Sequence, residues 1–177
     1  MRRRKFIRPL GTVAASTCQW GSSREAKGKT NCDHERGNTM IKGSCLCGGI
    51  GFEIDAVRSL THCHCRNCRK LTGAAFGSYV HVDADKFRLL SGKDLMQRFE
   101  SSTGSFRTFC KVCGSIAPSK ATYLTTLSIP AGLLDNDPGV RPKLHVFVSS
   151  KAPWWDIADG LPQHEKWVPG FAPKEQA

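Results

Sequence analysis

Seven of the nine cysteines fall into three short clusters whose spacings suit metal ligation. The middle cluster, Cys63, Cys65 and Cys68, has the pattern CxCxxC. Three thiolates this close in sequence can occupy three corners of a tetrahedral zinc site and leave the fourth corner for another ligand. Catalytic zinc sites keep such a position for water or substrate, so the sequence makes these three cysteines the first candidates for catalysis.

Two cysteine pairs flank the middle cluster. Cys45 and Cys47 lie upstream with CxC spacing, and Cys110 and Cys113 lie downstream with CxxC spacing. Short-spaced pairs that the fold brings together usually form a closed four-cysteine zinc site. A glycine follows each pair, and glycine readily adopts the positive φ that turns backbone amides toward sulfur. The sequence therefore predicts two zinc ions per chain, one in a closed structural site and one in an open site.

Other assignments of these cysteines stay open. His62 or His64 could complete the middle cluster, although neighbours in an extended CxC run point to opposite sides of the backbone. Both zinc ions could also be purely structural. A disulfide framework is disfavoured, because an odd number of cysteines with CxC and CxxC spacings is typical of metal ligation in a reducing compartment. We therefore expect a cytoplasmic protein.

Three basic residues, Arg66, Arg69 and Lys70, follow the middle cluster closely. They could be an ordinary solvated charge run. Beside a zinc ion with three thiolates, whose summed charge is negative, they could instead offset that charge and bind an anionic ligand. We favour this supporting role at the open site.

The net charge of the 177-residue chain is +11, which would suit a nucleic-acid or membrane-surface partner. Position weakens that interpretation: residues 1–39 hold nine basic and three acidic residues, so +6 of the net charge belongs to this segment. Nucleic acid is therefore a disfavoured partner. No apolar run approaches the ~18 residues of a membrane helix, so we expect a soluble protein without a membrane partner.

Residues 1–39 show no hydrophobic periodicity and are rich in Gly, Ser, Thr and basic side chains, which predicts a disordered basic extension. The run from Arg3 to Arg8 resembles a twin-arginine export signal, but the following residues 9–16 are short and weakly apolar for one. Alternatively, Met40 is the natural start and the preceding segment is an upstream extension. Residues 40–177 are predicted to form one zinc-binding catalytic domain.

The elements that must position the cysteines are short strands. Ile50, Phe52 and Ile54 alternate with polar or small residues, which indicates a half-buried strand. No segment has the pattern of a long amphipathic helix, so the predicted fold class is mainly β. Further strands are expected at residues 76–82, 87–90, 95–99, 124–129 and 144–148, with a turn at 101–104 and a helical turn at 67–71.

Five segments together resemble a known family: residues 43–53, 63–76, 101–115, 131–135 and 145–154. They contain all seven clustered cysteines with matching flanks, and closely resemble the glutathione-dependent formaldehyde-activating enzymes, a family that also includes centromere protein V. The resemblance covers about residues 41 to 170. It has no clear counterpart for residues 116–128, and none for the segment before Met40.

This resemblance implies a compact zinc-binding β-tent fold of short antiparallel strands with few short helices. It implies a structural zinc on Cys45, Cys47, Cys110 and Cys113 and a catalytic zinc on Cys63, Cys65 and Cys68. The implied activity is condensation of formaldehyde with glutathione to S-hydroxymethylglutathione, a carbon-sulfur lyase reaction.

The leading hypothesis is that the thiol of glutathione, or of a related compound, joins the open site as a thiolate and attacks formaldehyde. No residue stands out in the sequence as a general base. The main alternative is a non-catalytic, zinc-stabilised interaction module that binds an acidic partner such as chromatin through the basic tail. A further alternative is the same zinc chemistry on another thiol or carbonyl compound.

Overall fold

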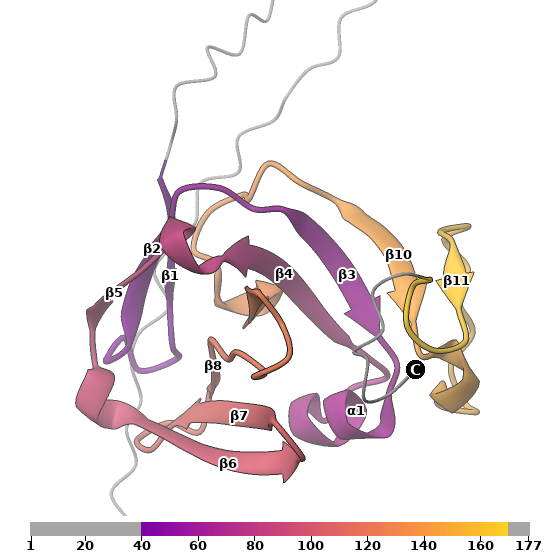
Figure 1. Cartoon of the computed structure of the whole chain (residues 1–177), viewed down its shortest axis with the longest axis horizontal. Coiled ribbons are helices and arrows are strands. Elements are labelled where there is room, and N and C mark those ends of the chain that lie inside the picture. Colours follow the sequence, from indigo (N-terminus) through magenta and orange to yellow (C-terminus); the bar gives the residue numbers. More distant parts are fainter. Residues whose placement is uncertain (1–39, 170–177) are drawn as a thin grey trace, which may run out of the picture. The chain divides into compact units, whose positions relative to one another are not determined.

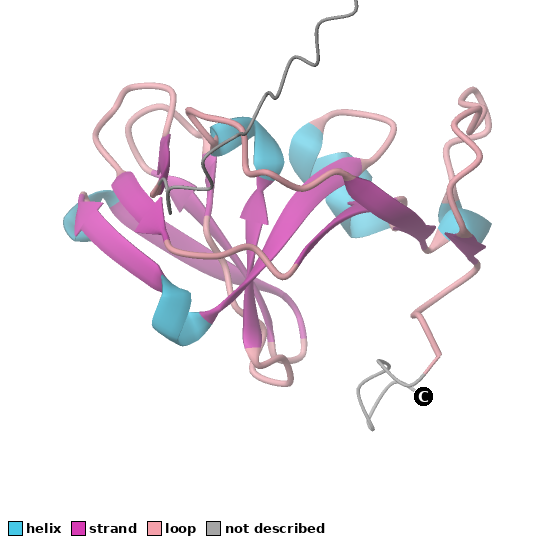
Figure 2. Cartoon of the chain, turned by 90° about the horizontal axis from the view of Figure 1, so that it is seen from above, coloured by secondary structure: helices cyan, strands magenta, loops and turns pink. Residues whose placement is uncertain are grey.

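The computed structural model describes residues 40–169, and in them the chain is mainly β (Figures 1 and 2). The predicted disorder of residues 1–39 lies outside the described residues. Residues 40–169 form eleven strands and one α-helix, α1 (Arg66–Thr72), and Figure 1 labels these elements where there is room. The strands are β1 (Ile41–Ser44), β2 (Gly51–Ile54), β3 (Ser59–Cys63), β4 (Gly77–Asp83), β5 (Phe87–Ser91), β6 (Met96–Ser102), β7 (Ser105–Cys110), β8 (Ile116–Ala117), β9 (Thr126–Pro130), β10 (Pro142–Val146) and β11 (Gln163–His164).

Single turns of 3-10 helix join some of the strands, at Ala84–Lys86, Lys93–Leu95, Ala131–Leu133 and Val148–Ser150. The mainly β fold class predicted from the sequence is confirmed, and every strand predicted from alternation overlaps an observed strand. The predicted helical turn at 67–71 lies within α1. Among the described residues, no helix is long and apolar enough to cross a bilayer.

The strands form three small sheets, with orders β1-β2-β5, β11-β10-β3-β4-β9 and β6-β7-β8. Most pairs are antiparallel, as expected, but β10 runs parallel to both β3 and β11. The parallel pairing was not expected, because it joins segments far apart in sequence and leaves no local turn signal. It places Val146 of β10 directly beside Cys63 of β3.

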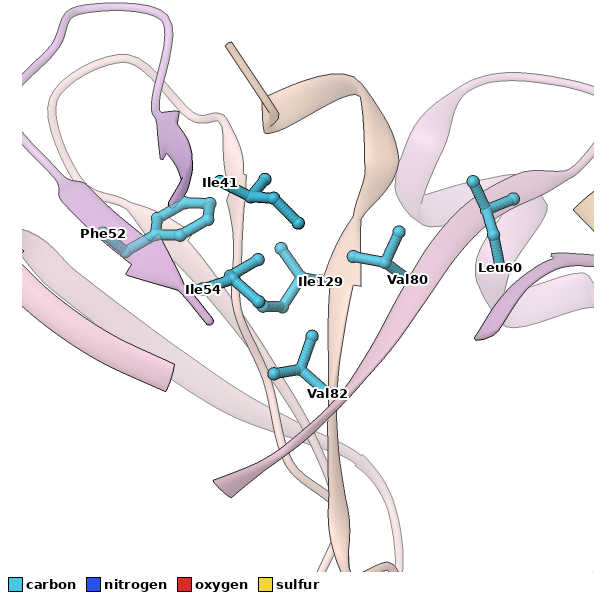
Figure 3. Packing of buried hydrophobic residues seen from close by; sticks show 7 residues of the cluster. All are labelled: Ile41, Phe52, Ile54, Leu60, Val80, Val82 and Ile129. Atoms are coloured by element: carbon cyan, nitrogen blue, oxygen red, sulfur yellow. The ribbon is translucent and has the colours of Figure 1, made fainter. Parts of the chain in front are cut away.

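The main hydrophobic core lies between the first sheet and one face of the five-stranded sheet. Figure 3 shows Ile41, Phe52 and Ile54 facing Val80, Val82 and Ile129. All six side chains are at most 7% exposed. The side chains on the other face of β3, β4 and β9 do not enter this core, and several of them line a cavity.

Side chains on the second face alternate with the core residues along the same strands. Leu60 belongs to the core, whereas Thr61 and Cys63 line a cavity. Val80 and Val82 are likewise core residues, whereas Tyr79 and His81 line that cavity. Because successive side chains of a strand point to opposite faces, the core fixes which residues of β3 and β4 face the cavity.

A core substitution in β9, a strand of the five-stranded sheet, should be costly. Ile129→Ala is expected to lower the free energy of unfolding by about 2–5 kcal/mol, because Ile129 is fully buried between the two sheets. Leu90→Ala, at a site that is 58% exposed, is the matched control and should cost about 0.5 kcal/mol or less. Urea unfolding of both variants measures the difference, and equal effects would contradict the assigned core.

Candidate metal centres and the adjoining cavity

The two outer cysteine pairs meet in one cluster. The Sγ atoms of Cys45, Cys47, Cys110 and Cys113 all lie within 4.8 Å of one another. Two of the S···S distances are 3.4 Å, for Cys45 and Cys47, and 3.9 Å, for Cys47 and Cys110. Neighbouring sulfurs of a tetrahedral zinc site lie about 3.8 Å apart when the Zn–S bonds are about 2.3 Å. The geometry therefore suits a closed four-sulfur metal site.

Similar turns present the two pairs of this cluster. After Cys45, Gly48 has φ +73° and its N–H donates to the Cys45 carbonyl at 2.8 Å. After Cys110, Gly114 has φ +75° and its N–H donates to the Cys110 carbonyl at 2.9 Å. Positive φ favours glycine, which explains why a glycine follows each pair. The cluster also packs with apolar side chains of a second small core, including Ile50.

The middle cysteines form a second cluster at the junction of β3 and α1. Cys63 ends β3, Cys65 caps the N-terminus of α1, and Cys68 is a buried residue of the helix. Their Sγ atoms also lie within 4.8 Å of one another. The Cys65 sulfur accepts the backbone N–H of Cys68 at 3.3 Å, so the helix start itself orients one potential ligand.

The electrostatics of this second cluster favour a bound cation. Interactions with the Cys63 and Cys68 side chains lower the pKa of Cys65 to about 2. Interactions with Cys65 and Cys68 in turn raise the pKa of Cys63. Three neighbouring thiolates repel one another, so all three can ionise together only when a cation offsets their charge. Both clusters thus have the donor chemistry and the spacing to hold metal ions.

The two histidines beside these cysteines lie outside the clusters. The Nδ1 atom of His62 is 2.9 Å from the Ser78 hydroxyl, and Nε2 of His64 is 2.8 Å from Nδ1 of His145. Within residues 40–169, no histidine nitrogen joins either group of sulfur atoms. The structure therefore does not support closure of the middle cluster by histidine.

His64 instead belongs to a relay of hydrogen bonds that anchors the cysteine-bearing turn and consists of the buried His64 and His145 and the exposed Asp159. The carboxylate of Asp159 lies 2.9 Å from Nε2 of His145, and an ionised carboxylate can only accept, so this nitrogen carries the proton. Nδ1 of His145 lies 2.8 Å from Nε2 of His64, so a hydrogen bond joins the two rings. Burial, followed by the charge of His145, lowers the pKa of His64 to about 4, so that His64 stays neutral. The backbone N–H of His64 donates to the Val146 carbonyl at 2.9 Å.

A cavity of about 810 Å³ adjoins the three-cysteine cluster. Cys63, Cys65 and Cys68 all line it, whereas none of the four clustered cysteines does. Its volume is in the usual range for small-molecule sites. Among the residues that the structure describes, three basic side chains and no acidic side chain line the wall, so the cavity favours an anionic ligand. These basic residues are Arg58, Arg107 and Lys143.

The basic residues singled out in the sequence occupy a different place. Arg66 and Lys70 are exposed, and the Arg69 Nε–H donates to the His64 carbonyl at 3.3 Å. None of the three lines the cavity. Their role toward an anionic ligand stays a prediction. Sequence reasoning missed Arg58, Arg107 and Lys143 because they are scattered along the chain and only the fold gathers them.

Comparisons with known proteins place these features in a family. A family model described as "Glutathione-dependent formaldehyde-activating enzyme" matches residues 40–150, a segment that contains all seven clustered cysteines. No curated protein matches the chain. A solved structure of a Rhodobacter sphaeroides protein is similar at 20% sequence identity and a TM-score of 0.48. The similarity covers 57% of this chain and 91% of that one.

The two clusters should respond differently to loss of a sulfur ligand. Cys110→Ser and Cys63→Ser are each expected to remove one metal equivalent, because each takes one ligand from one cluster. Cys110→Ser should lower Tm much more, since Cys110 is fully buried in the second small core. Elemental analysis and thermal unfolding test both expectations, with Cys32→Ser as the control outside the clusters. Loss of both metals in either variant would contradict two independent sites.

Proposed function

The chain belongs to the glutathione-dependent formaldehyde-activating enzyme family, and we propose that it condenses glutathione, or a related thiol, with formaldehyde to give S-hydroxymethylglutathione. The reaction is of the carbon-sulfur lyase type. One observation carries the proposal: the three-cysteine cluster lines the large cavity, whereas the four-cysteine cluster lies outside it. A small-molecule thiol in the cavity would therefore meet the cluster that has room for one more sulfur ligand.

The proposed metals are two zinc ions. Cys45, Cys47, Cys110 and Cys113 would hold a structural zinc, and the remaining three clustered cysteines a catalytic zinc. When bound by three cysteines, zinc lowers the pKa of a further thiol ligand and keeps it as a thiolate at neutral pH. Reduced cysteines suit a reducing compartment, so we propose the cytoplasm as the location.

Residues of the cavity wall would select and hold the thiol compound. Arg107 has its Nε–H bonded to the Ser101 hydroxyl at 3.1 Å, which fixes the orientation of its guanidinium. Lys143 adds a second positive charge, and no acidic side chain between residues 40 and 169 lines the wall to compete for either. Glutathione carries carboxylates, so these charges would orient it with its sulfur toward the cysteines. Such positioning turns a two-molecule reaction into a nearly unimolecular one.

The proposed reaction forms one bond and moves one proton. The thiol sulfur attacks the carbon of formaldehyde, a sulfur–carbon bond forms, and the π electron pair of the carbonyl moves to oxygen. The proton that leaves the thiol ends on that oxygen. Nothing is oxidised or reduced, so no further cofactor is required.

A Cys65→Ser variant should lose condensation activity and keep its fold. Serine is a good N-cap, so α1 should form, but the cluster loses one of its three sulfurs. About half of the bound zinc should remain, in the four-cysteine site. Exchange spectroscopy with glutathione and formaldehyde measures turnover above the uncatalysed rate. X-ray absorption with and without glutathione reports whether a new sulfur joins the metal in the unaltered protein. Full activity in Cys65→Ser would refute the assignment.

A chain that starts at Met40 should keep full activity. Both cysteine clusters and the cavity lie within residues 40–169. The alternative, an interaction module for an acidic partner, predicts instead that removal of residues 1–39 abolishes most binding to DNA, together with its steep salt dependence. Turnover of the shortened chain, and its binding to DNA across a salt series, separate the two functions.

A further inference from the structure

A threonine and a histidine form a hydrogen-bonded pair on the wall of the catalytic cavity. Oγ1 of Thr61 lies 2.9 Å from Nε2 of His81. Thr61 belongs to β3 and His81 to β4, and both side chains line the same cavity as Cys63, Cys65 and Cys68. The proposed reaction has so far given this pair no role.

Strand register places the pair close to the cysteine cluster. Thr61 is two residues before Cys63 on β3, so both side chains point to the same face of the sheet. Cys63 pairs with Gly77 across the β3–β4 ladder, Thr61 with Tyr79, and Ser59 with His81. The imidazole of His81 therefore reaches Thr61 diagonally across the two strands. Along β3, Thr61 lies two residues nearer to Cys63 than Ser59, the residue opposite His81.

We propose that His81 accepts the proton of the incoming thiol and that the Thr61 hydroxyl carries it between them. This inference rests on the proposed condensation. As the thiol ionises, its S–H bond breaks, the Thr61 oxygen takes that proton, and the Thr61 hydroxyl proton passes to Nε2 of His81. After the sulfur–carbon bond forms, the same path returns the proton to the oxygen that was the carbonyl oxygen. His81 and Thr61 thus end in their starting states.

The surroundings of His81 favour its neutral form, which can accept a proton. Burial lowers the pKa of His81, so the imidazole is neutral at pH 7. The nearby charges, Arg58 and Asp83, form an ion pair with each other at 3.5 Å. The backbone N–H of Arg58 donates to the His81 carbonyl at 2.9 Å, which holds the two backbones together at His81.

Among residues 40–169, no acidic side chain lines the cavity that His81 faces. Tyr79 is its neighbour on the same face of β4, and burial raises the pKa of that hydroxyl, so Tyr79 is neutral. Across the other side of β4, Ser128 of β9 pairs with His81. The remaining charges on the cavity wall, Arg107 and Lys143, are positive. Positive neighbours favour the neutral imidazole, which is the form that can take up a proton.

The test compares kcat and KM of the zinc-loaded full chain with those of His81→Gln, over a pH series with glutathione and formaldehyde. In the wild type, kcat should fall in acid as His81 becomes protonated, with an apparent pKa below the usual value of about 6.5. His81→Gln should lower kcat by about 10²-fold or more and remove this acid limb. The KM for glutathione and the zinc content should stay unchanged, because His81 is neither a zinc ligand nor a carboxylate partner.

Three further variants separate proton transfer from a structural role. Thr61→Val should lower kcat while keeping the histidine, because valine cannot carry the proton. Thr61→Ser should restore most of the rate. His164→Gln, in β11 and outside the cavity, is the matched control and should behave as the wild type.

Two results would overturn the inference while the proposed function stands. One is an active wild type whose kcat and pH profile are unchanged in His81→Gln, which would make the pair a structural cross-strand bond. The other is a raised KM with unchanged kcat, which would make His81 a binding group. A wild type with no turnover above the uncatalysed rate would instead remove the proposed function itself, and the role of His81 with it.

Discussion

The alternation of side chains along β3 and β4 is the constraint on which the rest of the structure depends. Leu60, Val80 and Val82 must enter the core, because apolar burial is the main favourable term in folding. Once they do, the residues between them must face the opposite side of the sheet. Cys63 and His81 therefore line the cavity as a consequence of core packing. A shift of one residue in the pairing register of β3 or β4 would turn its core side chains toward the cavity and its cavity side chains toward the core.

The two cysteine clusters are built differently, and the difference matches their surroundings. The four-cysteine cluster joins segments 63 residues apart and packs within a small apolar core, so a metal there would link distant parts of the fold. The three-cysteine cluster comes from one strand end and the helix that follows. The hydrogen bonds among His64, His145 and Asp159 anchor its turn, and its three cysteines line the cavity. The four-cysteine cluster therefore suits a structural metal, and the three-cysteine cluster suits a metal that meets a ligand in the cavity.

Charge distribution within the fold says more about the ligand than the net charge of the chain. Of the net charge of +11, +6 belongs to residues 1–39, which hold none of the seven clustered cysteines. Within the described part of the chain, the cavity wall instead gathers three basic side chains from different parts of the sequence and holds no acidic one. Beside a cluster of cysteines, this arrangement favours an anionic ligand, as the proposed function requires.

The sequence by itself determined the mainly β fold class, the strands with clear alternation and the division of seven cysteines into sets of four and three. These signals are local, since spacing limits which sulfurs can meet and alternation marks a half-buried strand. It gave no sign of β3, because Leu60 is the only aliphatic residue in Ser59–Cys63. Only the tertiary structure decided which cluster lines the cavity and placed Thr61 beside His81, 20 residues away. Such contacts arise from strand register and from the parallel pairing of β10, which depend on long-range packing and leave no local pattern.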